Sequence, residues 1–192
     1  MPVGSIALVV NRSGPEICMK KILIVFSHSE FVKSRINKAM LTAIRDLENV
    51  TVHILEESGP NFKFDIAKEQ ALLEAHDVIV LQFPMYWYSC PAVMKLWIDE
   101  VMQYGWAFGS TGTALKGKTL VCASSQGGSA EDFTATGDYQ YSVEEFYRPF
   151  EITAKFCKMA YDEPFLIFDT SHITDAELER SAADYRSWLK SL

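Results

Sequence analysis

The stretch DVIVLQFPMYWYSCPAVMKLWIDEVMQYGW, residues 77–106, decides the fold. It opens with an apolar run, Val78–Phe83, interrupted by a single glutamine, which is typical of a strand buried on both faces of a parallel sheet. Pro84 ends this strand because proline has no N–H to donate to a sheet ladder. Apolar residues then recur at helical spacing to about Gln103, and Gly105 is expected to end the helix. The stretch therefore predicts the strand, loop and helix unit of an α/β protein.

The loop inside this unit, Met85–Tyr88, is aromatic. It follows the carboxyl end of a central strand, which is where ligands bind in open α/β sheets. The loop offers ring faces, a thioether and backbone amides but no carboxylate, so it suits a large planar ring better than a sugar, a metal or a peptide. A packed turn whose aromatic side chains fill a core or a subunit interface is the alternative that this loop alone leaves open.

The composition bounds the class of protein. The chain has 192 residues, 48% of them hydrophobic, which supports one globular domain with a full core. Its net charge of −7 predicts no general affinity for nucleic acid or for an anionic membrane. The four cysteines and four histidines lack metal-ligand spacing, so we expect reduced thiols, a cytoplasmic location and no metal site. No apolar run approaches the roughly 20 residues that span a bilayer.

The first 18 residues differ from the rest of the chain. They contain two glycines and two prolines around one short apolar patch, Ile6–Val10, which is too short for a signal-peptide core. The text from Met19 onward, MKKILIVFSH, resembles a natural beginning. We expect residues 1–18 to be an upstream extension and residues 19–192 to be a single domain. An arm that packs on a partner is the alternative for the extension.

The first strand and the loop after it have the layout of an anion site. The apolar strand Ile22–Phe26 precedes a polar loop, and a helix is expected to start near Ser34. Backbone N–H groups at a helix N-terminus are free and the helix dipole favours negative charge there. His28 and Arg35 add donors, and the loop contains neither a Walker pattern nor a glycine-rich fingerprint. A cradle for one terminal phosphate fits these residues, with ordinary N-capping by Ser34 as the alternative.

The remaining elements alternate between strands and helices, which predicts a doubly wound five-stranded parallel sheet of order 2-1-3-4-5 with helices on both faces. The further strands are expected at 50–55, 119–124 and 165–168. The further helices are expected at 66–75, where Asp65 caps, at 143–158, where Pro149 interrupts the helix or delays its start, and after Thr174 or Asp175.

A glycine pair follows the fourth strand. Gly127 and Gly128 permit positive φ and a close approach of the backbone to a ligand. In the predicted strand order this turn, the phosphate-type loop and the aromatic loop face one crevice. Three loops that are distant in sequence would then meet a phosphate, a ring face and a ring edge.

At this point the residues match a family. The chain from Met19 onward resembles the flavodoxin-like NAD(P)H:quinone oxidoreductases, and within them the ancillary subunits of glutathione-regulated potassium-efflux systems. The matching segments are FSHSE at 26–30, SRIN at 34–37, QFPMYWYSCPAVMKLWIDEV at 82–101, GWAFG at 105–109, GTALKGK at 112–118 and QGG at 126–128. The chain has Ser29 where the family commonly has proline, and Ser125-Gln126 where Thr-Thr is commoner.

The resemblance implies an FMN cofactor, with FAD as the alternative, and NADH or NADPH as hydride donor. It further implies two-electron reduction of quinones in ping-pong order by a homodimer with its site near the interface. By the same resemblance the phosphate and ribityl chain are held by His28, Ser34, Arg35, Ile36 and Asn37. The ring is bordered by Pro84, Met85, Tyr86 and Trp87, and its pyrimidine edge is reached by Ser125, Gln126, Gly127 and Gly128. Tyr139, Tyr141 and His172 are candidates to protonate a quinone oxygen.

Two other functions stay open. One is a regulatory subunit that activates a potassium-efflux transporter and so lies at the inner membrane through that partner, a role that can coexist with the enzyme. The other is a passive one-electron carrier of the flavodoxin type. A phospho-acceptor receiver domain, which shares the topology, is excluded because it needs an aspartate at the end of the third strand, where this chain has Gln82-Phe83-Pro84.

Overall fold

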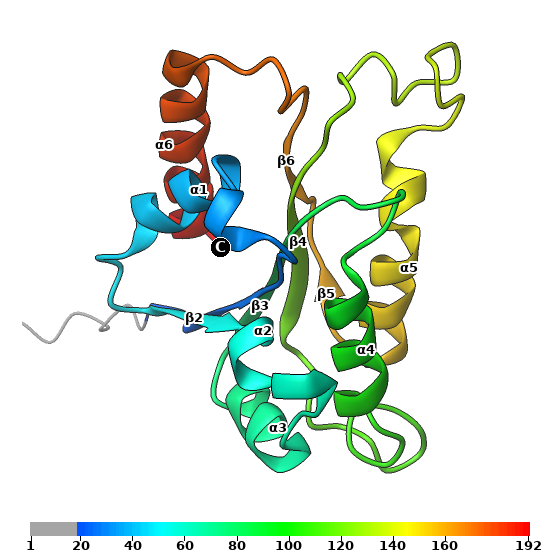
Figure 1. Ribbon diagram of the computed structural model, residues 1–192. Helices are drawn as coiled ribbons and strands as arrows, with labels where there is room; N and C mark the ends of the chain where they lie inside the picture. Colours follow the sequence, from blue (N-terminus) through cyan, green and yellow to red (C-terminus); the bar gives the residue numbers. More distant parts are fainter. Residues whose placement is uncertain (1–18) are drawn as a thin grey trace, which may run out of the picture.

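The computed structural model describes residues 19–192, so the predicted extension, residues 1–18, lies outside the described part. Its centre is one parallel sheet of order β2-β1-β3-β4-β5, with β6 also paired to β4 (Figure 1). The predicted doubly wound sheet and its strand order are thereby confirmed. The strands are β1 (Ile22–Phe26), β2 (Val50–Ile54), β3 (Val78–Pro84), β4 (Thr119–Ser125), β5 (Ala160–Tyr161) and β6 (Phe165–Ile167).

The fifth position of the sheet consists of two short strands instead of one. β5 pairs with the first half of β4 and β6 with its second half. Between them lie Asp162, Glu163 and Pro164, and proline cannot donate a hydrogen bond to the ladder. The sequence predicts only the second of these strands, which ends one residue earlier than predicted, at Ile167.

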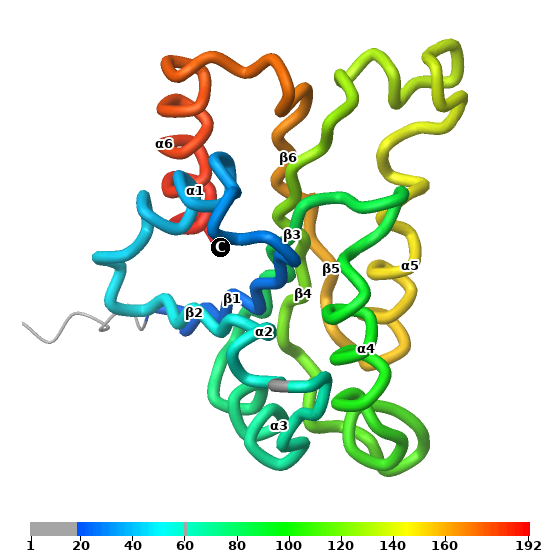
Figure 2. The backbone as a smooth tube through the Cα atoms, viewed as in Figure 1, coloured from blue at the N-terminus to red at the C-terminus, as the bar shows by residue number. Residues whose placement is uncertain are grey.

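Helices cover both faces of the sheet. α1 and α6 pack in one hydrophobic cluster, and α3, α4 and α5 pack in the other. Figure 1 shows α1 and α6 on one side of the strands and α4 and α5 on the other, and the tube in Figure 2 has the same division. The helices are α1 (Ile36–Ile44), α2 (Leu55–Ser58), α3 (Ile66–Glu74), α4 (Ala92–Val101), α5 (Val143–Phe156) and α6 (Asp175–Ser191), with 3₁₀ turns η1 (Phe31–Lys33) and η2 (Pro60–Phe62).

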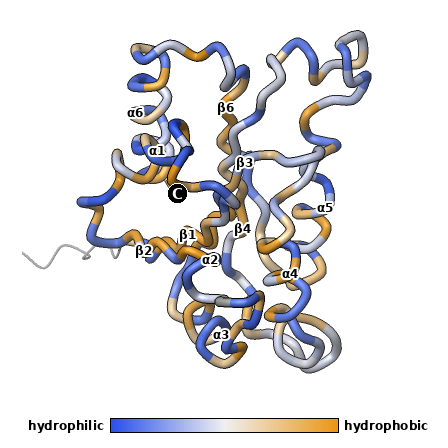
Figure 3. The backbone as a smooth tube through the Cα atoms, in the orientation of Figure 1, coloured by the Kyte–Doolittle hydropathy of each residue, from blue (hydrophilic) through white to orange (hydrophobic). Residues whose placement is uncertain are grey.

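The central strands supply side chains to both clusters because alternate residues of a strand point to opposite faces. Leu23 and Val25 of β1 lie in the cluster with α3, α4 and α5, whereas Ile24 lies in the cluster with α1 and α6. All five residues of β1 and all seven of β3 are buried. Figure 3 shows the corresponding hydrophobic colour along β1, while the outer helices alternate between the two colours.

The starts of α3, α5 and α6 follow the capping rules. Asp65 caps α3 by accepting from Lys68 N, and Thr174, not Asp175, caps α6 in a capping box with Glu177. The prediction that Pro149 interrupts or delays the helix was wrong, because α5 runs unbroken from Val143. Its start is fixed by a second capping box, Ser142 with Glu145, and the helix tolerates the one bond that proline removes.

The histidine of β2 has a carboxylate partner, and the described cysteines are free thiols. His53 of β2 lies 2.7 Å from the buried carboxylate of Glu69, which also accepts from Trp97 Nε1. Cys90, Cys122 and Cys157 are buried and free, and Cys18 lies outside the described residues. Within residues 19–192 no helix combines the length and apolarity needed to cross a membrane. In the same range no three His, Cys, Asp or Glu side chains gather as a metal ion would require.

Candidate functional site

The loop after β1 is held by a carboxylate from the neighbouring strand end. Glu56, the second residue of α2, accepts from Ser27 Oγ (2.7 Å) and from His28 N (2.9 Å) through the same oxygen. Its other oxygen is buried and has no hydrogen-bond partner among the described residues. Because a buried carboxylate oxygen without a donor is unfavourable, this side of the loop fits a ligand hydroxyl or a water.

The imidazole of His28 has a defined tautomer. Its Nδ1 accepts from Glu30 N (3.0 Å), and a backbone N–H can only donate, so the neutral ring carries its proton on Nε2. Burial lowers the pKa of His28 and outweighs the nearby Glu56 carboxylate, which raises it. At neutral pH the side chain therefore presents a neutral N–H donor.

The N-terminus of α1 supplies further donors. Ser34 Oγ accepts from Asn37 N (3.2 Å), as a capping side chain does. Within residues 19–192 no hydrogen bond uses the amides of Arg35 or Ile36, so both are available to an anion. The guanidinium of Arg35 points elsewhere, donating to Ile173 O (2.8 Å) and pairing with Asp175. An anion bound at this helix start would therefore meet backbone amides, whereas the Arg35 guanidinium is engaged by Ile173 and Asp175.

A buried polar network joins this cradle to the other two loops. Asn37 is 1% exposed, accepts from Gln82 Nε2 (3.2 Å) and donates to Ser125 Oγ (3.3 Å). Gln82 in turn accepts from Tyr185 Oη (2.7 Å). Met85 N donates to Ser125 O (2.9 Å). One asparagine therefore links α1 to β3 and β4 at the carboxyl edge of the sheet, where both remaining loops begin.

The aromatic loop is a strained two-residue turn. Tyr86 and Ser89 exchange both backbone hydrogen bonds (2.9 and 3.1 Å), and the residues between them, Trp87 and Tyr88, have φ of +46° and +63°. Side chains other than glycine and asparagine rarely adopt such angles, and each costs on the order of 1 kcal/mol or more. Trp87 is 91% exposed despite its size. Ser29 Oγ donates to Tyr86 Oη (3.3 Å), so this turn touches the loop after β1.

The glycine turn after β4 provides amides and open space. The amides of Gly127 and Gly128 donate to no atom of residues 19–192, and an added Cβ at Gly127 would meet nothing within 4 Å. Neither glycine uses the positive φ that the sequence allowed. At Gly128 a Cβ would lie 2.8 Å from Tyr139 Oη, which brings the tyrosine over the turn. The side chain of Gln126 is buried and bonds to Tyr147, so it faces the core.

The assembled edge can hold an elongated ligand with an anionic group, a planar ring and a polar ring edge. The donors of His28 and α1 lie at one end, the exposed rings of Tyr86 and Trp87 follow, and free amides of the glycine turn lie beside them. A family model described as Flavodoxin-like fold matches residues 20–189.

The chain belongs to the flavodoxin-like family.

This flavodoxin-like chain is 40% identical over 169 residues to the glutathione-regulated potassium-efflux system ancillary protein KefG of Cronobacter sakazakii, covering 88% of this chain and 92% of KefG. It is similar to the solved structure of general stress protein 14 of Treponema denticola in complex with FMN (45% identity, TM-score 0.85, 89% and 98% coverage). It is also similar to a P. pentosaceus structure described as an NADPH-quinone reductase (33% identity, TM-score 0.80, 88% and 96% coverage).

Sequence reasoning missed two contributors to this flavodoxin-like site. Glu56 is not among the residues predicted from the sequence, although its place just past the edge strand β2 puts it beside the first loop. The segment at Asp169 and Thr170 was not assigned, yet its amides donate to Gly128 O (2.8 Å) and Gln126 O (3.1 Å). Asp169 has φ of +49°, a signal that only the structure contains.

Proposed function

We propose that this protein is an FMN-dependent NAD(P)H:quinone oxidoreductase. The observation that carries the proposal is the bonding of the three loops to one another through Asn37, Ser125 and Tyr86. It is supported by the likeness to a relative solved with FMN and to one described as an NADPH-quinone reductase. FAD is the alternative flavin, and either NADH or NADPH is the donor.

Each part of the cofactor has residues that fit it. We assign the phosphate and ribityl chain to His28 Nε2 and the start of α1, where Ser34, Arg35, Ile36 and Asn37 lie. We assign the ring to the border formed by Pro84, Met85, Tyr86 and Trp87. The pyrimidine edge is assigned to the free amides of Gly127 and Gly128, which stabilise negative charge there, with Ser125 and Gln126 holding the turn from behind.

The chemistry that FMN supplies when bound is hydride acceptance from NADH or NADPH and two-electron donation to a quinone. Nicotinamide and quinone take the same exposed place in turn, which gives ping-pong order. Of the three candidates to protonate a quinone oxygen, Tyr139 is placed best because it lies against Gly128 and its ring is 5.4 Å from that of Tyr88. Burial raises the pKa of Tyr139, so its hydroxyl keeps the proton at neutral pH.

The test is aerobic purification followed by an absorption spectrum and by NADH and NADPH oxidation with menadione. We expect a yellow protein that oxidises at least one nicotinamide in the presence of the quinone. A colourless protein that takes up no added FMN contradicts the proposal. A flavoprotein that oxidises neither nicotinamide, but exchanges electrons with another protein, would instead be the passive one-electron carrier.

A regulatory role is the second candidate, and the specific observation in its favour is the 40% identity to KefG over 92% of that protein. We propose that this chain also binds a membrane potassium-efflux transporter and so is a cytoplasmic protein held at the inner membrane. The test is potassium efflux from cells carrying the transporter with and without this chain. If potassium efflux is the same with and without this chain, the regulatory role is refuted and the proposed enzymatic activity is unaffected.

We also propose a homodimer, with an interface at the amino edge of the sheet instead of beside the cofactor site, where the resemblance implied it. Three large apolar side chains near the ends of α4 and α5 are well exposed, namely Tyr104 (70%), Ile152 (59%) and Phe156 (63%). They line a hollow of about 520 Å³ between these helices and the loop after α4. Exposed apolar patches of this kind favour a protein interface. Phe156→Asp should shift sedimentation from dimer to monomer, and a parent chain that sediments as a monomer would refute the interface.

A further inference from the structure

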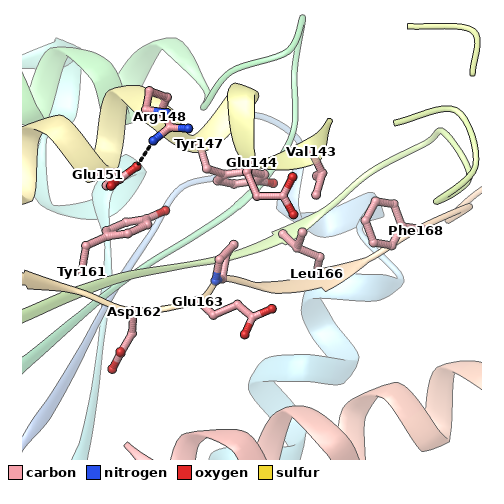
Figure 4. A pocket seen from close by; sticks show the side chains of 11 residues that line it. Val143, Glu144, Tyr147, Arg148, Glu151, Tyr161, Asp162, Glu163, Leu166 and Phe168 are labelled. Carbon is pink, nitrogen blue, oxygen red and sulfur yellow. Dashed lines mark hydrogen bonds and ion pairs between the residues drawn. The ribbon is translucent and has the colours of Figure 1, made fainter. Parts of the chain in front are cut away.

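A cavity that the three loops do not use lies between α5 and the outer edge of the sheet. Its volume is about 630 Å³, within the range of binding pockets. Figure 4 shows α5 on one side and the β5–β6 segment on the other, with the rings of Tyr147, Tyr161 and Phe168 between them. Leu166 of β6 adds an aliphatic surface. The cavity therefore has an aromatic and apolar interior that runs along an edge strand.

Both walls of this cavity carry negative charge. Glu144 and Glu151 come from α5, and Asp162 and Glu163 come from the segment between β5 and β6. Among residues 19–192 one cation lines the cavity, Arg148, and it is paired with Glu151 (2.9 Å, Figure 4). Glu151 also pairs with Lys155 of α5, so four carboxylates against two cations leave a local charge of −2. The cavity accordingly favours a positively charged ligand.

The backbone at the mouth of the cavity is open. Ile167 O accepts from Gln126 N (2.8 Å), so the peptide groups of Ile167 face β4. Because the N–H and C=O of successive residues in a strand point to opposite sides, those of Leu166 face away from β4. In residues 19–192 no strand pairs with β6 on that side. Leu166 thus presents one donor and one acceptor to an incoming strand.

A second hollow lies on the other face of the same strand. It has a volume of about 350 Å³ and shares Leu166 and Phe168 with the first cavity. Its lining includes the carboxylates of Asp169 and Glu177. A strand added at the edge of a sheet points alternate side chains to the two faces. The two sets of side chains would therefore enter two different hollows, each of which is lined in part by carboxylates.

We propose that this edge binds an extended basic segment of a partner protein, which adds as a strand beside β6 and places an apolar side chain in the cavity. A second copy of this chain fits poorly, since an antiparallel pairing of β6 with its own copy, centred on Leu166, would place Glu163 of each copy opposite Asp169 of the other. Main-chain bonds at Leu166 give affinity, and the acidic rims select lysine or arginine. This binding site does not depend on the proposed redox function.

The probe is a fluorescein-labelled peptide of about eight residues that alternates lysine with valine, followed by fluorescence anisotropy at low salt. A glutamate–valine peptide is the sequence-matched control. We expect the lysine peptide to bind, the glutamate peptide not to bind, and added salt to weaken binding. The double variant Asp162→Asn, Glu163→Gln should weaken binding about tenfold. Glu48→Gln with Glu57→Gln, which removes two charges elsewhere, should leave binding unchanged.

A second measurement separates strand addition from mere attraction of charge. Hydrogen exchange of the Leu166 amide should slow at least about tenfold when the peptide is bound, since a new acceptor covers it. A peptide methylated on all of its amides should not bind, because it has no N–H to donate to Leu166 O on either edge.

Four results would overturn the proposal. The first is no binding of the lysine peptide at low salt, and the second is binding that leaves the Leu166 amide unprotected. The third is full displacement of the peptide by phenethylammonium at equal concentration, which would make the cavity a small-cation pocket. The fourth is protection of the Leu166 amide that rises with protein concentration in the absence of peptide, which would make a second copy the occupant.

Discussion

Replacing Asn37 by alanine tests the network on which the site depends. Asn37 is 1% exposed, accepts from Gln82 Nε2 and donates to Ser125 Oγ. In the variant the Gln82 amide retains only a weak contact with Met40 Sδ at 4.0 Å. A buried donor left without an acceptor costs about 1–3 kcal/mol, and Ser125 loses a further neutral hydrogen bond of about 0.5–1 kcal/mol. Alanine recovers about 0.5 kcal/mol through its higher helix propensity.

The expected net loss is therefore about 2 kcal/mol in the free energy of unfolding, measured by urea denaturation of flavin-free protein. The matched control is Asn49→Ala, which removes one exposed bond to Lys20 O and should cost less than about 1 kcal/mol. In a Gln82→Met background, Asn37→Ala should lower the free energy of unfolding by about 1 kcal/mol less, because the Gln82 amide that would lose its acceptor is no longer present.

Flavin affinity gives a second readout of the same variant. Asn37 holds the start of α1 against β3 and β4, so we expect the dissociation constant of FMN, measured by fluorescence quenching, to rise at least about tenfold, which corresponds to about 1.4 kcal/mol. If Asn37→Ala unfolds within about 0.5 kcal/mol of the parent, the buried bridge contributes nothing and the argument fails. If stability falls but FMN binds as before, the network supports the fold alone.

Three other changes have expected outcomes. Gly128→Val should abolish flavin retention while circular dichroism shows an intact fold, since the new side chain meets Tyr139 and fills the turn. The side chain of Gly127→Ala, by contrast, enters open space. Full FMN occupancy in Gly128→Val would refute our placement of that turn. The pKa of His28 is lowered in the fold, so its share of stability is present above its ordinary value of about 6.5 and is lost as pH falls through the folded value. The variant His28→Gln should flatten that loss in pH-dependent urea unfolding, and an unchanged pH profile would contradict the assignment. Trp87→Gly should raise the melting temperature of flavin-free protein by relieving positive φ, whereas Trp87→Ala should not, and equal effects would argue against strain in the turn.

Much of the fold was readable because local patterns and global packing agree. The central strands β1 and β3 are apolar runs, broken only by Gln82 before Pro84 in β3, and such runs between turn residues are typical of strands buried on both faces. The cap of α3 at Asp65 was predictable because a side-chain oxygen before a helix satisfies its free amides, whereas for α6 the sequence left Thr174 and Asp175 open and the structure has Thr174. The prediction that Pro149 interrupts or delays α5 was wrong, because the start of the helix is set by its capping box and by the packing around it.

The candidate site was predictable in its loops but not in its contacts. The sequence indicates that the segments after β1, β3 and β4 carry the donors, the rings and the free amides, because the order of parallel strands determines which loops share an edge. It does not indicate that Arg35 and Gln126 turn away from that edge. The direction of a side chain depends on partners that are far away in the chain, such as Asp175 and Tyr147.

The sequence by itself therefore determined the class of fold, the strand order and the three loops that face one crevice, since hydrophobic period and turn chemistry are local properties. Only the tertiary structure decided the bridge at Asn37, the support of the first loop by Glu56, the strained turn at Trp87 and the open acidic edge at β6. These features join residues from different strands and helices, and their geometry exists only after the sheet has brought those elements together.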